Sequence, residues 1–188
     1  MSSIKCNANI DISDLHLTEI SFKIDINGFI YIFDEKTDDV NTLLIEEKGW
    51  RRVISGVLFD NNTIKIEAVG KEQIHRTVFG TILEPEERTS ERIIRINGEN
   101  FGTLRECSSL KFSWLIEPQP YHHTLNNWET FYYGNTTRDV QIYYKSNLFA
   151  VAKYYKGFYQ FLILKNNYLS FCLGLALAAI DSSDNGDI

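Results

Sequence analysis

The residues that could do chemistry are few, and their spacing assembles no familiar site. His122 and His123 follow Tyr121 in a proline-bearing stretch that we expect to be a loop. Adjacent histidines point to opposite faces of a strand and have no fixed geometry in a loop, so the pair is not spaced as metal ligands. The sequence has no H-E-x-x-H, G-x-S-x-G, phosphate-binding loop or G-x-G-x-x-G motif. We predict a non-enzymatic protein without a cofactor; an enzyme would require a polar cleft with His122 or His123 beside a carboxylate.

The C-terminal tail offers a partial calcium loop. Asp181, Ser183, Asn185 and Gly186 stand at the first, third, fifth and sixth places of an EF-hand loop. Such a loop also needs a bidentate Glu at the twelfth place, followed by a helix. The sequence stops at the eighth place, Ile188. We therefore assign no metal to residues 181–187 and expect an acidic terminus.

Size and charge exclude some classes of function. The chain has 188 residues with 44% hydrophobic and 23% charged side chains, which is typical of one globular domain, residues 1–188. The net charge is -6, and the 19 basic residues form no run. A nucleic-acid-binding protein normally shows a basic footprint, so we predict no nucleic-acid partner. An acidic surface favours a basic protein partner.

The cysteines and the N-terminus point to the cytoplasm. Cys6, Cys107 and Cys172 are far apart and include no C-x-x-C pair, which argues against a disulfide framework and a structural zinc site. The N-terminal residues lack the apolar region of a secretory signal. Ser2 stands where N-myristoylation needs a glycine.

Most of the chain before residue 165 is patterned as short strands. The run EISFKID leads to Asn27-Gly28 and then to FIYIFD, which is a strong hairpin signal. The frame I-x-I-N-G recurs seventy positions later, at Asn97-Gly98. About a dozen strands at roughly ten-residue spacing favour a sandwich or a barrel.

The segment YLSFCLGLALAAID, which begins at Tyr168, breaks this pattern. It is rich in leucine and alanine with one β-branched residue, so a helix over about residues 167–181 is favoured over a buried strand, with Asn166 or Asn167 as its cap. At about 1.5 Å per residue, its apolar part reaches only about 20 Å, short of a membrane span of about 30 Å. A helix that is apolar nearly all round must be enclosed by protein. The sequence therefore predicts a mainly β fold, an antiparallel β-barrel of about twelve strands closed around its C-terminal helix.

The C-terminal segment YYKGFYQFLILKNNYLSFCLGLALAAID resembles the signature of the tubby C-terminal-like superfamily, in particular its LURP-one-related proteins and phospholipid scramblases. The units IDINGFIYIFDEK and INGENFGTLRE, with Gly102 as a glycine before the next strand, resemble the paired strand, glycine turn and strand units of this family. The likeness covers most of the chain. It implies a twelve-stranded barrel filled by a hydrophobic helix that ends at an acidic residue, here Asp181.

The resemblance also implies work at a membrane surface, since tubby domains bind phosphoinositide head groups through Lys and Arg. The candidate head-group contacts are Arg51, Arg52, Lys153 and Lys156, in a peripheral, not transmembrane, protein at the inner membrane surface. This hypothesis predicts that the basic residues converge into one pocket at the barrel rim. The alternative is an acidic, immunity- or inhibitor-type protein that binds a protein partner. It predicts an acidic, tyrosine-rich face without a basic pocket; the tyrosine doublets that would supply it are Tyr132-Tyr133, Tyr143-Tyr144 and Tyr154-Tyr155.

Overall fold

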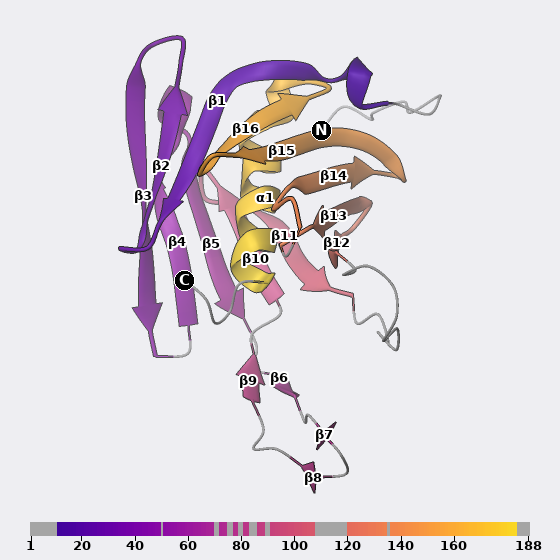
Figure 1. Cartoon of the computed structure of the whole chain (residues 1–188). Coiled ribbons are helices and arrows are strands. Elements are labelled where there is room, and N and C mark those ends of the chain that lie inside the picture. Colours follow the sequence, from indigo (N-terminus) through magenta and orange to yellow (C-terminus); the bar gives the residue numbers. More distant parts are fainter. Residues whose placement is uncertain are drawn as a thin grey trace.

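The computed structural model describes residues 11–49, 51–69, 72–74, 77–78, 81–82, 86–88, 91–107, 120–134 and 136–183. Twelve antiparallel strands form a closed barrel in the order β1-β16-β15-β14-β13-β12-β11-β10-β5-β4-β3-β2, so that the last strand pairs with the first (Figure 1). The barrel strands are β1 (His16–Asp25), β2 (Phe29–Asp34), β3 (Asp39–Lys48), β4 (Arg51–Val57), β5 (Thr63–Val69), β10 (Glu91–Ile96), β11 (Glu99–Glu106), β12 (Tyr121–Leu125), β13 (Trp128–Tyr132), β14 (Val140–Tyr144), β15 (Asn147–Tyr155) and β16 (Phe158–Ile163). The predicted fold class is confirmed.

The C-terminal segment is the helix that fills the barrel, as predicted. The helix α1 (Leu169–Ser183) runs along the barrel interior, and 13 of its 15 residues are buried (Figure 1). A 3₁₀ turn, Asn166–Tyr168, leads into α1, and the N-cap of this turn is Lys165. Asn166 and Asn167 therefore lie inside the turn, and the predicted asparagine cap is wrong.

The interior of the barrel is filled by side chains. The strands contribute inward-facing Ile, Leu and Phe residues, and α1 meets them with small residues where space is short. A Cβ atom added to Gly174 would lie 3.1 Å from a methyl of Ile94 and 3.2 Å from one of Ile64. A void between α1 and strands β1 to β4 measures about 10 Å³, which is at most the space of one water molecule.

The two Asn-Gly hairpins have different loops despite their shared sequence frame. Between β10 and β11, Asn97 and Gly98 both have positive φ, 51° and 79°, as a two-residue type I′ turn requires. Between β1 and β2 the loop is Ile26-Asn27-Gly28, and within it positive φ is found at Gly28, 85°. A three-residue loop with a left-handed glycine at its end places Ile26 at the tip of the hairpin.

Between β5 and β10 the chain leaves the barrel in a narrow arm of two small ladders (Figure 1). Its strands are β6 (Glu72–Ile74), β7 (Thr77–Val78), β8 (Thr81–Ile82) and β9 (Glu86–Arg88). The run SLKFSWLIE, residues 109–117, is also patterned as a strand in the sequence, and it lies outside the described residues. His122 and His123 were expected in a loop, but they lie on β12, where residues 121–125 pair with β13.

Candidate functional site

The four predicted head-group residues lie on two separate parts of the barrel. Arg51 and Arg52 begin β4, Lys153 is near the end of β15, and Lys156 is in the turn to β16. Strands β3, β2, β1 and β16 lie between β4 and β15 in the sheet. The structure therefore brings Lys153 and Lys156 together and places the arginine pair elsewhere.

Arg52 belongs to a buried ion cluster at the C-terminal end of α1. Asp181 of α1 is 3% exposed, and its Oδ1 lies 3.0 Å from Nε of Arg52, an ion pair without the alignment of a hydrogen bond. Nε of Arg92, on β10, donates to the other carboxylate oxygen at 2.6 Å, and its Nη2 donates to the Asp181 carbonyl at 3.1 Å. Arg92 is fully buried. The cluster ties the end of the helix to β4 and β10, so Arg52 faces the interior.

Lys153 and Lys156 lie in a surface patch that we name the aromatic–basic tip. It is made by two turns that are neighbours because β1 pairs antiparallel with β16: Phe22, near the end of β1, lies opposite Tyr159, near the start of β16. One turn joins β1 to β2, and the other joins β15 to β16. The members of the tip are Lys23, Ile26, Arg138, Lys153, Tyr155, Lys156 and Phe158.

Three apolar side chains of the tip are unusually exposed. Ile26 is 83% exposed, Tyr155 61% and Phe158 39%. A hairpin tip normally carries polar or small residues, because apolar surface in water is unfavourable. Single exposed apolar residues are common, but three on adjacent turns indicate a contact surface.

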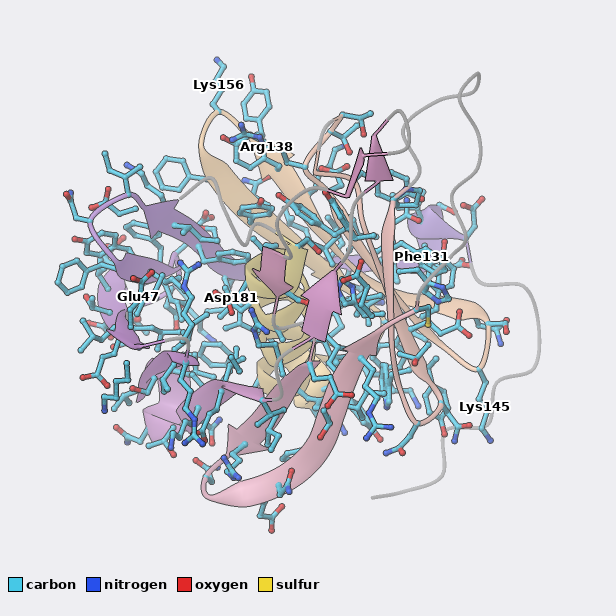
Figure 2. All side chains as sticks on the ribbon, turned by 90° about the horizontal axis from the view of Figure 1, so that it is seen from below. Glu47, Phe131, Arg138, Lys145, Lys156 and Asp181 are labelled. Atoms are coloured by element: carbon cyan, nitrogen blue, oxygen red, sulfur yellow. The ribbon has the colours of Figure 1, made fainter. Side chains whose placement is uncertain are left out.

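The basic side chains lie against these and neighbouring rings. Nζ of Lys156 is 5.1 Å from the ring centre of Tyr155, and Nζ of Lys23 is 5.8 Å from that of Phe158. Arg138 lies two residues before the start of β14, and its Nη1 donates to the hydroxyl of Tyr154 at 3.4 Å. This hydrogen bond raises the pKa of Arg138 above its ordinary value. Figure 2 shows Lys156 and Arg138 at one edge of the barrel, with Asp181 near its centre and Glu47 at another edge.

The tip carries a local positive charge on an acidic protein. Its four basic residues form no ion pair with any residue in the described ranges. The neighbouring carboxylates already have hydrogen-bond donors: Asp25 accepts from the Asn27 side chain at 3.0 Å, and Asp139 accepts from the Tyr154 amide at 2.8 Å. The positive side chains are therefore available to an anionic group.

The histidines do not form a cleft-bound catalytic pair. His122 is on the outer face of the sheet, stacked on Phe131 with ring centres 4.3 Å apart, and its Nε2 is 3.5 Å from a carboxylate oxygen of Glu129. His123 points the other way and is fully buried in the barrel. The pair thus separates across the sheet, as adjacent residues on a strand must. Within the part of the chain that the structure describes, no three His, Cys, Asp or Glu residues are grouped to hold a metal ion.

Sequence reasoning missed most of the tip. Its signals were local but weak: Ile26 stands where a hairpin loop is usually polar, and Tyr155 and Phe158 flank Lys156-Gly157 in another tight turn. The proximity of the two turns depends on the pairing of β1 with β16, which joins segments more than 130 positions apart.

None of the described helices is both long and apolar enough to span a bilayer. No family model, no curated protein and no solved structure matches the chain.

Proposed function

We propose that the protein is a non-enzymatic, peripheral membrane-binding module that places its aromatic–basic tip in the surface of an anionic bilayer. The observation that carries this proposal is the exposure of Tyr155, 61%, with Lys156 over its ring, and of Ile26, 83%, on the neighbouring turn. Lys156 has no ion-pair partner among the described residues. The proposal agrees with the resemblance to tubby-like proteins, and it implies the cytoplasmic membrane surface as the location.

The tip matches the chemistry of the bilayer interface. Amphipathic aromatic rings favour the head-group region, and basic side chains are attracted to anionic lipids. Full burial of an Ile or Phe side chain contributes about 1.5–3 kcal/mol. Each Lys or Arg close to an anionic surface contributes about 1 kcal/mol. These contributions support reversible binding that depends on both lipid charge and salt.

The acidic balance of the whole chain does not oppose this orientation. Salt screens exposed charges beyond about 8 Å at physiological ionic strength. The tip residues Lys156 and Arg138 lie at one edge of the barrel, and Glu47 lies at a different edge (Figure 2). The bilayer therefore meets the local positive charge of Lys23, Arg138, Lys153 and Lys156.

The filled barrel explains why binding would be external. A binding site is usually a concave pocket, whereas the interior here is occupied by α1 and its contacts. Outward-facing turns and strands remain as the surface that a ligand reaches.

Co-sedimentation with liposomes tests the proposal. Vesicles of phosphatidylcholine alone, with phosphatidylserine, and with a phosphoinositide are compared at low and physiological salt. We expect binding to both anionic vesicles, weakened by salt, and little binding to neutral ones. Absence of binding to all three vesicles at low salt would refute the proposal.

Matched variants locate the contact. Lys156→Glu should weaken binding at least tenfold, because reversal removes one favourable charge and adds a repelling one. Lys145→Glu is the control, since Lys145 has a similar φ, 47° against 49°, and also lies over a tyrosine ring, but in the turn at the other end of β15. Ile26→Ser should weaken binding about tenfold through lost apolar burial. Arg51→Glu tests the remaining exposed head-group candidate; equal losses at Arg51 and Lys145 would place the contact outside the tip.

A further inference from the structure

The outer surface of β2 and β3 breaks the rule that strands of a barrel present polar residues to water. The outward side chains of β2 are all aromatic, and two large aliphatic residues of β3 lie opposite them: Phe29 pairs with Leu44, and Phe33 pairs with Val40. Val40 is 53% exposed and Leu44 41%. We name this surface the β2–β3 face; its members are Phe29, Tyr31, Phe33, Val40 and Leu44.

The outer face of β5 is mostly polar. Its outward residues are Thr63, Lys65, Glu67 and, at the end of the strand, Val69, and Lys65 pairs with Glu67 at 3.3 Å. Arg95 of β10 reaches the same carboxylate at 3.1 Å. The composition of the β2–β3 face is therefore not a general property of this sheet.

The rings of the face pack against one another. Phe29 and Tyr31 have ring centres 6.3 Å apart, and Phe33 meets Phe158 across β1 at 5.5 Å. Ser21 of β1 pairs with Phe33 and is only 6% exposed although it faces outward. The face thus presents rigid aromatic surface, which costs little side-chain entropy when a partner binds.

The charge around the face is strongly negative. Residues 16–48, which hold β1 to β3, contain eight Asp or Glu and three Lys or Arg, a net charge of -5 out of -6 for the whole chain. Asp34, Glu35, Asp38 and Asp39 gather at the β2–β3 turn, which holds one basic residue, Lys36. Near the other end of β3, Glu46 is paired with Lys48 at 3.4 Å. The unbalanced acidic residues therefore flank the apolar face at the β2–β3 turn.

We propose that the β2–β3 face docks a basic protein whose Lys and Arg residues surround an apolar patch. Charge complementarity selects this occupant. A second copy of the chain would bring like charges together, and an anionic bilayer would be repelled. This surface adjoins the aromatic–basic tip at the contact of Phe33 with Phe158 but shares no member with it, so the proposal adds a protein partner to the membrane-binding function.

Site-specific photo-crosslinking tests this inference. Benzoylphenylalanine replaces Val40 in one full-length protein and Arg105 in a control; Arg105 is exposed, with 67% of its side chain accessible, on β11, five strands from β2 around the barrel. Irradiation in extract of the encoding organism should join a basic protein to the Val40 position and not to the Arg105 position. The captured protein is then purified for direct binding.

Direct binding to the purified partner decides the result. Leu44→Lys should weaken it at least tenfold, and Glu35→Lys with Asp39→Lys should slow association and flatten its salt dependence. Thr63→Lys, on the outer surface of β5, should change neither the affinity nor the rate of association. All these side chains are exposed, and unchanged thermal melts would show that each variant folds.

Three outcomes would overturn the docking proposal: crosslinks only between copies of this chain, a partner that is neutral or acidic, or no product from Val40. Vesicle binding by the same proteins separates this failure from failure of the proposed function. If Leu44→Lys binds anionic vesicles normally while Val40 yields no product, only the docking face is wrong. If Val40 captures a basic protein while no vesicle is bound, only the membrane function is wrong.

Discussion

Removal of the Asp181 carboxylate should be among the most damaging single changes in the barrel. Asp181→Asn keeps the shape of the side chain but leaves two guanidinium groups, those of Arg52 and Arg92, without their shared counter-ion. Arg92 is fully buried, and Arg52 has 14% of its side chain exposed. Loss of one partner from a buried ion pair costs about 3–5 kcal/mol, a large part of the roughly 5–15 kcal/mol that stabilises a typical domain.

Equilibrium unfolding in urea, followed by tryptophan fluorescence, measures this loss. Trp128 is a suitable reporter because it is buried and its ring lies 5.0 Å from that of Phe171 in α1. Glu67→Gln is the control: it breaks the partly exposed pairs of Glu67 with Arg95 at 3.1 Å and with Lys65 at 3.3 Å, and each such pair contributes at most about 1 kcal/mol.

A triple variant separates charge imbalance from simple loss of packing. Arg52→Met, Arg92→Met and Asp181→Leu together remove all three charges and keep similar volume, so stability should recover toward that of the unmodified protein. A loss below about 1 kcal/mol for Asp181→Asn, or a triple variant no more stable than Asp181→Asn, would refute the reasoning.

Three further changes test the packing and the turns. Gly174→Leu should destabilise the protein by several times more than Gly174→Ala in urea unfolding, because a Cβ alone already meets a methyl of Ile94 at 3.1 Å and overpacking costs about 1–3 kcal/mol or more. Burial raises the pKa of the Cys172 thiol. At a pH above the ordinary thiol pKa of about 8.5, the unfolded state therefore loses a proton that the folded state keeps. The free energy of unfolding then falls by up to about 1.4 kcal/mol per pH unit. Unfolding of Cys172→Ala between pH 8 and 10 should lack this slope; parallel slopes would contradict it. Asn97→Ala should cost about 1–2 kcal/mol in thermal unfolding, because it loses a left-handed asparagine and the hydrogen bond from the Thr63 amide to its side chain at 2.9 Å; an unchanged melting temperature would contradict it.

The architecture could be predicted because one segment left few alternatives. The composition around Leu173 and Ala178 favours a helix, its length is too short for a membrane, and a helix without a polar face needs an enclosing sheet. The arginine pair shows where this reasoning stops. Adjacent strand residues face opposite sides, so one of Arg51 and Arg52 had to point inward, but the following Val53 and Ile54 do not reveal which. Only the partners Arg92 and Asp181 decide it, and they come from distant parts of the chain.

The pattern of a single strand shows which residues are apolar, but not which of them stay exposed in the folded barrel. The run FIYIFD, residues 29–34, has no polar residue among its first five, which already signals a strand that is apolar on both faces. That pattern alone also fits a strand covered on both sides. The outward position of Phe33 next to acidic turns, with Val40 beside it, follows from the barrel geometry.

Stability and binding should separate in this protein because they depend on different sides of the sheet. The helix and the inward side chains form the core, whereas Ile26, Lys156 and Leu44 are exposed and contribute little to it. Surface substitutions away from special features usually change the unfolding free energy by less than about 0.5 kcal/mol. Variants at these three positions should therefore weaken binding at unchanged stability. Gly174→Ala, if it folds, should shift stability while vesicle binding of the folded fraction stays constant. A tip variant that lost binding and stability together would show that the turn is a structural support, and the contact surface would then have to lie elsewhere on the barrel.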